Sequence, residues 1–522
     1  MTPQFTGTRR ITGRELLDRL AEPGAELAIL DLRSPLERSR GHIAVSAGLP
    51  YHDLEQRIGR LVPDRATPVV LAGSPEVDER GAALLNRLGY TDVAVLDNGI
   101  DGWKSAGGRI YTGTNVRSKT LGEWIEHRYH TPTVDPDTVA AWRAEGIDVV
   151  LLDSRPAAEY RHHHIPEAYN SEGGAELVYR AGELVTNPDT RVVINCAGRT
   201  RGIVAAQSLI NTGIANPVFS LRNGTPAWQQ SGRPLAFGDG PAAPRPERVD
   251  ARLAEWAVTT LDRAGAATVD TATAARLLAD GPGTVYLFDV RTPEEFRDGH
   301  YAAAVSAPGG QLVQATDEYI AVRGAHVVLV DTPDFVRAAN TAQWLRFLHD
   351  GPLSVLAWHP DRDVARPTPA DVPVPRVATL DWPELARWRA DDAVSIVDLR
   401  PSDAYAAAHI PGSVHARREH LDELLAEAGA RPVVLVGDDD FRAEHIAAGL
   451  PGTRVLAGGI GAAGELTDEQ PRYAGEIVDR VGPPDFGPER DAWYAAYFEW
   501  ELSLLRESAG DPFFDFDAIE RR

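Results

Sequence analysis

The sequence predicts an α/β protein of four small domains in tandem, each with a mainly parallel sheet flanked by helices. Three observations lead to this prediction. The 522 residues are too many for a single hydrophobic core. One pattern of apolar and polar residues recurs four times along the chain. Within each copy, short β-branched runs alternate with stretches of helical periodicity, which is typical of small α/β domains.

Each copy opens with the same signature. An apolar run is followed by Asp-x-Arg, a short polar stretch and a histidine. The four segments read AILDLRSPLERSRGHI, VLLDSRPAAEYRHHHIPEA, YLFDVRTPEEFRDGHYAAA and SIVDLRPSDAYAAAHIPGSV. Their aspartates are Asp31, Asp153, Asp289 and Asp398. The apolar run predicts a strand, and the polar stretch after it predicts a short helix.

A second apolar strand follows in every copy. It reads TPVVLAG, RVVINCA, AHVVLVD and RPVVLVG, and an alanine-rich helical stretch comes after it. Three copies then close with a strand and a glycine turn, VAVLDNGIDGW, PVFSLRNGTPAW and TRVLAGGIGAAG. The third copy departs from this pattern with VLAWHP, so we regard it as degenerate. Strands that alternate with helices in this way predict parallel sheets.

Shifts in composition set the expected domain boundaries. The stretch ARPTPADVPVPRV is proline-rich and predicts an extended linker. The segment DAWYAAYFEWELSLLRES predicts an amphipathic helix that packs on the domains. The expected division is 1–111 for the first domain, 112–132 for a linker, 133–238 for the second domain, 239–266 for a linker with a helix, 267–360 for the third domain, 361–377 for the proline-rich linker, 378–470 for the fourth domain and 471–522 for a helical tail.

Composition narrows the class of protein. The apolar fraction of 43% and the charged fraction of 25% are ordinary for a soluble globular protein. A formal net charge of −23 should repel nucleic acid and anionic membranes, so we expect neither as a partner. A single cysteine excludes an internal disulfide and a CxxC metal site, which favours a reducing cytoplasm. The N-terminal residues show no signal peptide, and no run approaches the roughly 18 apolar residues of a membrane span.

Cys196 is the only cysteine in the chain, and its surroundings predict a nucleophile. It follows the strand RVVIN and precedes the helical run GIVAAQSLI. A loop at a helix N-terminus points unpaired backbone N–H groups at one spot, which favours a thiolate there. Gly198 lets the backbone curl tightly, and Arg199 and Arg201 add positive charge. The predicted substrate-binding residues beside Cys196 are Ala197, Gly198, Arg199, Thr200 and Arg201.

The chain resembles the rhodanese family of sulfurtransferases over nearly all of its length, as four rhodanese-like units. The match to the family is most specific in the second unit. The residues that carry it are Asp153, Arg155 and the histidine-isoleucine-proline of 164–166, the loop INCAGRTRG, and the closing segment LRNGTPAW with Trp228. The resemblance implies that Cys196 carries sulfur as a persulfide. The implied donor is thiosulfate or a persulfide, and the acceptor is cyanide or a thiol, with a protein thiol as one acceptor class. It implies no organic cofactor and no metal.

The other three units lack the nucleophile. Laid over the second unit, they place Ala72, Asp331 and Gly437 at or next to the position of Cys196. The resemblance therefore implies the fold for all four units and the activity for the second alone. Because Asp-x-Arg recurs in units without a cysteine, we interpret this pair as structural, tying strand to loop.

Other basic residues receive structural interpretations. The run His162–His164 suggests a metal, but no second cluster supplies further ligands, so no metal site is expected. His164 matches the family's structural histidine, and its neighbours are expected on the surface. Arg117 and Lys119 lie in the linker before the second domain, where we expect them to be solvated. The alternative is that they face the Cys196 pocket.

Two other classes of function stay open. The first is a scaffold or sulfur-carrier partner, in which the three cysteine-less units are docking surfaces. The second is a cysteine-dependent phosphatase or arsenate reductase, because those enzymes also use a cysteine-first anion loop. Their loop is one residue longer between cysteine and arginine than the stretch from Cys196 to Arg201, which favours sulfur chemistry here.

Overall fold

The computed structural model describes residues 8–22, 24–366 and 372–521. The chain forms two compact units. Unit one comprises Met1–Leu20, Ala28–Gly113 and Ala370–Gly482, and unit two comprises Ala21–Leu27, Thr114–Pro369 and Pro483–Arg522. Unit one therefore holds the first and fourth repeats, and unit two holds the second and third repeats with the C-terminal segment. Among the described residues, no helix is both long enough and apolar enough to cross a membrane.

The second repeat folds as a parallel sheet with Cys196 just beyond its central strand. The strand order is β6 (Thr133–Val134), β10 (Val218–Leu221), β9 (Arg191–Asn195), β7 (Val149–Asp153) and β8 (Tyr169–Asn170). The helices are α7 (Pro136–Ala144), α8 (Ala157–His162), α9 (Gly174–Leu184), α10 (Thr200–Asn211) and α11 (Gly224–Gln230). Leu152 and Ile194 belong to one core layer, and Leu151 and Val193 to the other. Burial on both faces explains the continuous apolar runs of β7 and β9.

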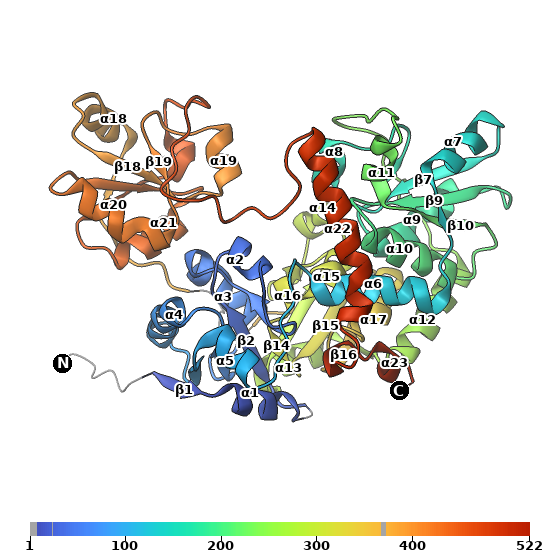
Figure 1. Ribbon diagram of the computed structural model, residues 1–522. Coiled ribbons are helices and arrows are strands. Elements are labelled where there is room, and N and C mark those ends of the chain that lie inside the picture. The colour runs from blue at the N-terminus through green and yellow to red at the C-terminus, as the bar shows by residue number, and fades with distance from the viewer. Residues whose placement is uncertain (1–7, 23, 367–371, 522) are drawn as a thin grey trace. The chain divides into compact units, whose positions relative to one another are not determined.

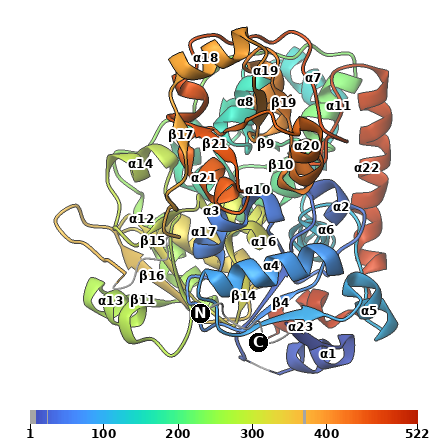
Figure 2. The ribbon, with the colours of Figure 1, turned by 90° about the vertical axis from the view of Figure 1, so that its left-hand side faces the viewer.

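The third repeat has the same strand order. It runs β11 (Ala267–Val269), β16 (Leu353–Ala357), β15 (His326–Asp331), β12 (Val285–Asp289) and β13 (Val305–Ser306), and Figure 2 shows β11, β16 and β15 side by side. Its helices are α12 (Ala251–Arg263), α13 (Thr271–Asp280), α14 (Pro293–Asp298), α15 (Gly309–Gln314), α16 (Thr316–Tyr319) and α17 (Val336–Leu345). Helix α9 of the second domain packs against α15 and α17. The two domains therefore share a helical interface within unit two.

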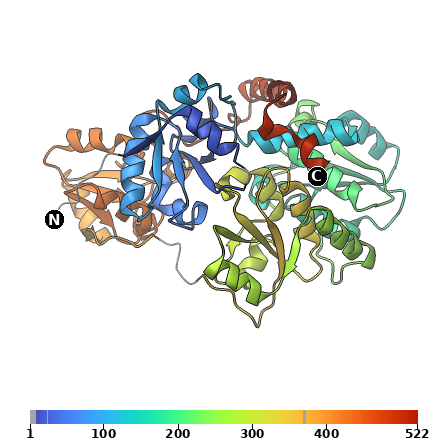
Figure 3. The same cartoon turned by 90° about the horizontal axis from the view of Figure 1, so that it is seen from below.

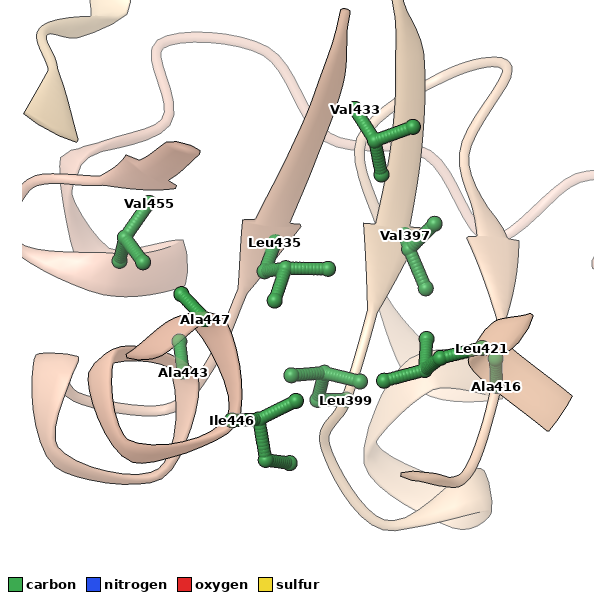
Figure 4. Packing of buried hydrophobic residues seen from close by; sticks show 10 residues of the cluster. All are labelled: Val397, Leu399, Ala416, Leu421, Val433, Leu435, Ala443, Ile446, Ala447 and Val455. Atoms are coloured by element: carbon green, nitrogen blue, oxygen red, sulfur yellow. The ribbon is translucent and has the colours of Figure 1, made fainter. Parts of the chain in front are cut away.

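Unit one holds two further sheets of this kind. The first domain has β1 (Arg9–Ile11), β5 (Val93–Leu96), β4 (Val69–Leu71), β2 (Leu27–Asp31) and β3 (Ala47–Gly48), with helices α1 (Gly13–Leu20), α2 (Pro35–Ser39), α3 (Leu54–Leu61), α4 (Pro75–Arg87) and α5 (Gly99–Ser105). The fourth has β17 (Thr379–Leu380), β21 (Thr453–Leu456), β20 (Val433–Val436), β18 (Ser395–Asp398) and β19 (Val414–His415), with helices α18 (Trp382–Ala390), α19 (Ser402–Ala407), α20 (Leu421–Ala428) and α21 (Asp440–Ala448). Figure 4 shows Val397 and Leu435 on its central strands and Leu399 next to Ile446 of α21, all in one apolar cluster. This apolar layer between sheet and helix is the core that the repeated strand pattern encodes.

The Asp-x-Arg signature forms an ion pair with a fully buried or largely buried arginine in every domain. In the second domain, Arg155 donates to Asp153 from Nε at 2.9 Å and from Nη2 at 2.7 Å. Its Nη2 also donates to the carbonyl oxygen of His163 at 2.7 Å. The equivalent pairs are Asp31–Arg33, Asp289–Arg291 and Asp398–Arg400. The pair therefore ties the end of a central strand to the turn after the following helix, as a structural element does.

Two helices outside the repeats complete unit two. Helix α6 (Val116–Tyr129) lies in the segment 112–132 that we expected to be a linker. Helix α22 (Pro488–Glu507) lies against α6, as Figure 1 shows, and the red and cyan helices are also neighbours in Figure 3. Helix α22 buries Tyr494 and Phe498, which lie one turn apart on the same face. Short helix α23 (Phe516–Glu520) follows it in the chain.

Candidate active site

Cys196 lies in the loop between β9 and α10. The β-branched residues before it favour the strand. The cysteine is only 2% exposed. The Gly198 N–H donates to Sγ over 3.3 Å, and the Gly202 N–H is also directed at the sulfur. These two N–H groups form a small cradle suited to a sulfur anion.

The glycine turn after β10 fixes the Cys196 peptide. The Thr225 N–H donates to the Cys196 carbonyl oxygen over 2.9 Å. Gly224 has a φ of +58°, and a β-carbon there would lie 2.2 Å from the same oxygen. Only glycine fits such a position. The NGTPAW turn therefore holds the backbone of the nucleophile, while Trp228 packs into the core.

The same backbone contact identifies the residues that replace Cys196 in unit one. In the fourth domain, the N–H of Ile460, the counterpart of Thr225, donates to the carbonyl oxygen of Gly437 at 2.9 Å. In the first domain, the N–H of Ile100 donates to that of Gly73 at 3.3 Å. Gly73, rather than Ala72, is thus the counterpart of Cys196. The sequence placed Ala72 at or next to this position, and the backbone contact assigns the neighbouring residue Gly73. Neither glycine carries a nucleophile.

In the third domain, Asp331 takes the place of Cys196 and is sealed by an arginine. Val330 pairs with Asp289 as Asn195 pairs with Asp153, so Asp331, the last residue of β15, has the position that Cys196 has directly after β9. Arg337 Nε donates to Asp331 Oδ1 at 2.9 Å, and both side chains are fully buried. Burial raises the pKa of Asp331 to about 6, against the opposing charge of Arg337. An ion pair therefore fills the position of the anion loop.

Arg201 is the cation that acts on the sulfur. Its Nη1 and Nη2 each donate to the carboxylate of Glu159 at 2.8 Å, a bidentate pair that fixes the guanidinium plane. Burial raises the pKa of the Cys196 thiol above its ordinary value, and Arg201 is the largest influence that opposes the rise. Arg201 and the two N–H groups therefore reduce the rise in the pKa of Cys196 but do not cancel it. The sequence led us to expect a lowered pKa, so this expectation was wrong.

Arg199 docks the loop onto helix α6. Its Nε and Nη2 donate to the Glu123 carboxylate at 2.7 and 2.8 Å, and Nη2 also pairs with Glu126. Its side chain is buried, so these two carboxylates balance a charge that has little contact with water. Arg199 therefore positions the loop, while Arg201 supplies the local positive charge.

We expect iodoacetamide to alkylate Cys196 with a pH midpoint above that of a free thiol, which is about 8.5. Arg201→Ala should move the midpoint up by about 1 pH unit, because it removes the main charge that favours the thiolate. Arg199→Ala is the matched control and should leave the midpoint unchanged, since that charge is taken up by Glu123. Identical profiles for wild type and Arg201→Ala would show that the backbone alone sets the ionisation.

The expectation of a solvated linker around Arg117 and Lys119 was wrong. Residues 116–129 form a helix that is enclosed by other parts of unit two. Arg117 donates to backbone carbonyl oxygens at 2.6 and 3.2 Å, which is a structural role. Lys119 is buried, and its Nζ lies 5.0 Å from the ring centroid of Tyr497 and 4.7 Å from that of Trp500.

The three consecutive histidines diverge in the structure. The ring of His164 stacks on Tyr160, and its Nδ1 lies 3.1 Å from the carbonyl oxygen of that residue. His162 is exposed as expected. His163 is buried, contrary to the expectation of a surface residue, because Phe486 packs edge-on against its ring at 5.3 Å. In the described part of the chain, no three histidine, cysteine or carboxylate side chains are grouped to hold a metal ion.

Sequence reasoning missed the acidic and aromatic residues that cover the loop. Glu159 and Glu123 hold the two arginines, and Tyr497 and Glu501 of α22 lie against Gly198. A β-carbon on Gly198 would be 3.3 Å from the Tyr497 ring and 3.6 Å from Glu501 Oε2. The aromatic spacing of α22 indicated a helix, but nothing in it indicated where the helix docks.

A cavity beside the loop is lined by residues of two domains. Thr200, Arg201 and Gly174 come from the second domain, and Gln314 and Asn340 come from the third. The third domain thus contributes to a cavity that reaches two of the predicted substrate-binding residues.

Comparison with known proteins agrees with this geometry. The rhodanese-like domain family matches residues 12–106, 135–231 and 381–463, together just over half of the chain. The crystal structure of a thiosulfate sulfurtransferase from Pseudomonas aeruginosa is 35% identical, covers 97% of this chain and 99% of its own, and has a TM-score of 0.90. The Alr3790 protein from Anabaena sp. is 28% identical over 19% of this chain and 80% of its own, with a TM-score of 0.18. No curated protein sequence matches. The chain belongs to the rhodanese family of sulfurtransferases.

Proposed function

We propose that the protein moves sulfane sulfur from thiosulfate or a persulfide donor to cyanide or a thiol acceptor, through a persulfide on Cys196. The observation that carries the proposal is the placement of the chain's single thiol in a cradle of two backbone N–H groups beside Arg201. The similar Pseudomonas aeruginosa structure is that of a thiosulfate sulfurtransferase, which supports thiosulfate as the donor.

The reaction proceeds in two half-reactions. The Cys196 thiolate attacks the outer sulfur of thiosulfate, the sulfur–sulfur bond of the donor breaks, and sulfite leaves with the bonding pair. The acceptor then attacks the sulfane sulfur, and Cys196 leaves as a thiolate. The N–H groups of Gly198 and Gly202 and the charge of Arg201 stabilise the sulfur anions in both steps. Ala197 and Thr200 complete the loop that positions these groups.

The single cysteine has a mechanistic consequence. A persulfide that is released by internal disulfide formation needs a second cysteine, and this chain has one in total. The sulfur on Cys196 must therefore leave to an outside acceptor, and the intermediate should persist when no acceptor is present. The reducing cytoplasm expected from the cysteine count would supply thiol acceptors.

Steady-state kinetics tests the two-step scheme. When thiosulfate and cyanide are varied together, we expect parallel double-reciprocal lines and one sulfite released per turnover, because the donor leaves before the acceptor reacts. Intersecting lines, which indicate that both substrates bind before reaction, would contradict a covalent intermediate.

The phosphatase alternative fits the loop less well. Both terminal nitrogens of Arg201 already donate to Glu159, so a phosphoryl group would have to compete with a carboxylate for the same donors. The carboxylate would also repel a dianion. The scaffold alternative draws support from the third domain, whose anion position is closed by Asp331 and Arg337. We propose that this domain supports the second one through their shared cavity.

A further inference from the structure

Glu501 presents an unused carboxylate oxygen beside the candidate nucleophile. It lies on α22 and is 1% exposed. Its Oε1 accepts hydrogen bonds from Tyr497 Oη at 2.8 Å and from Thr200 Oγ1 at 3.1 Å. Among the described residues, no hydrogen-bond partner lies within reach of Oε2. A buried carboxylate oxygen without a partner is costly, so its position calls for a functional explanation.

The free oxygen faces the Cys196 loop. A β-carbon on Gly198 would lie 3.6 Å from Glu501 Oε2, and the Gly198 N–H is the group that donates to Cys196 Sγ. Cys196 is almost completely buried, and side chains of α22 cover the loop at Gly198. Glu501 is one of those side chains.

The groups around Glu501 shift its pKa in opposite directions. The groups that face it are Lys119 and Glu123 of α6, Tyr497 of α22, and Cys196 and Arg199 of the loop. Burial raises the pKa of Glu501, and the ammonium of Lys119 is the main charge that opposes the rise. Lys119 therefore favours the ionised form of this buried acid and opposes the effect of burial.

Glu501 does not assist the first half-reaction. Burial is the main cause that raises the pKa of Cys196, and the negative charge of Glu501 raises it further. A carboxylate at this place works against thiolate formation on Cys196. In the second half-reaction a carboxylate is useful when the acceptor is a neutral thiol, because that thiol must lose its proton as its sulfur attacks.

We propose that Glu501 is the catalytic base of the thiol-acceptor half-reaction, and that its Oε2 takes the proton of the incoming thiol. This inference rests on the proposed function. The Cys196 persulfide left by thiosulfate is an anion and first takes a proton from water. As the proton of the incoming thiol moves to the carboxylate, the thiol sulfur bonds to the outer sulfur of this protonated persulfide. The bond between that sulfur and Cys196 Sγ breaks, and Cys196 keeps the electron pair as a thiolate. The product is the hydropersulfide of the acceptor, and the proton on Glu501 is later lost to water.

The inferred substrate class is thiols that are still protonated at neutral pH. Sulfite, which reverses the first half-reaction and regenerates thiosulfate, attacks as the dianion, which is already present near neutral pH without help from a base. Glu501 should therefore matter for a thiol acceptor and not for sulfite. This contrast separates proton removal from a general effect on the loop.

The test uses full-length protein that has been loaded with sulfur from thiosulfate and then mixed rapidly with glutathione or with sulfite. In Glu501→Gln, the side-chain amide oxygen still accepts from Tyr497 and Thr200. We expect discharge to glutathione at neutral pH to slow about 100-fold, because general base catalysis is lost. Loading by thiosulfate should be at least as fast as in wild type, and discharge to sulfite should be unchanged. Glu499→Gln, an exposed position on the same helix, is the matched control.

The pH profile gives a second readout. The defect of Glu501→Gln should shrink as the pH rises past the pKa of glutathione, since the acceptor then arrives as a thiolate. Equal slowing toward glutathione and sulfite, or a wild-type rate toward glutathione, would overturn the inference. Failure of the wild-type protein to take up sulfur would instead overturn the proposed function.

Lys119→Met supports the test if Glu501→Gln does not fold. Removal of the ammonium raises the pKa of Glu501, so the base is ionised only at higher pH. We expect the pH profile of discharge to glutathione to move upward, while the profile with sulfite keeps its wild-type position. An unchanged profile with glutathione would contradict the role of Glu501.

Discussion

Replacement of Cys196 with serine is expected to lower thiocyanate formation from thiosulfate and cyanide by at least about 1,000-fold, as loss of a catalytic nucleophile does. Serine is close to cysteine in size and can accept the Gly198 N–H that now donates to Sγ. Its hydroxyl does not ionise near neutral pH and cannot carry sulfane sulfur as a thiolate can.

The control for this variant is its stability. Because the substitution removes no hydrogen-bond partner of the loop, the thermal unfolding midpoint should stay close to that of wild type. A serine variant that turns over thiosulfate at the wild-type rate would contradict the assignment of Cys196. A variant that is inactive and also unfolded would have to be replaced by Cys196→Ala before the activity is interpreted.

Substitution of Arg337 with alanine is expected to lower the free energy of unfolding of unit two by about 3–5 kcal/mol, because it leaves buried carboxylates without a counter-ion. Arg337 is fully buried and pairs with Asp331 at 2.9 Å, with Glu295 at 2.7 Å and with Glu176 at 3.2 Å. Glu176 belongs to the second domain, so the ion cluster also joins the two domains. Urea unfolding followed by circular dichroism measures the change.

Arg297→Ala is the matched control for this experiment. Arg297 pairs with Glu294 at 3.1 Å in the same domain, but the two side chains are 67% and 58% exposed. Exposed pairs contribute little, so the control should change the free energy of unfolding by less than about 1 kcal/mol. Equal effects of the two substitutions would show that the third domain does not depend on its buried cluster.

The α/β fold was predictable because its determinants are local. Apolar strands, the Asp-x-Arg signature and the glycine turns each occupy a few neighbouring residues. Because the same pattern occurs four times, each copy supports the interpretation of the others. The rhodanese family was predictable for the same reason, and comparison confirmed it. The sequence located the counterpart of Cys196 in the first domain only as Ala72 or a neighbouring residue, because an apolar run does not mark where its strand ends; the structure assigns Gly73.

The surroundings of the site were not predictable because they depend on contacts between distant segments. Arg199 meets Glu123, 76 residues away, and Thr200 meets Glu501, 301 residues away. Helix α6 was taken as a linker because it is buried on several faces, so its sequence lacks the clear polar stripe of a surface helix. A carboxylate beside a buried thiol has no signature in a single sequence.

The most direct measurement is the mass of the intact protein after incubation with thiosulfate and removal of the free donor. We expect the wild-type mass to increase by one sulfur atom, located on the peptide that contains Cys196. The added sulfur should be absent in Cys196→Ser and should leave when cyanide is added. An unchanged mass, or an added oxyanion in place of sulfur, would contradict a sulfurtransferase that works through a persulfide on Cys196.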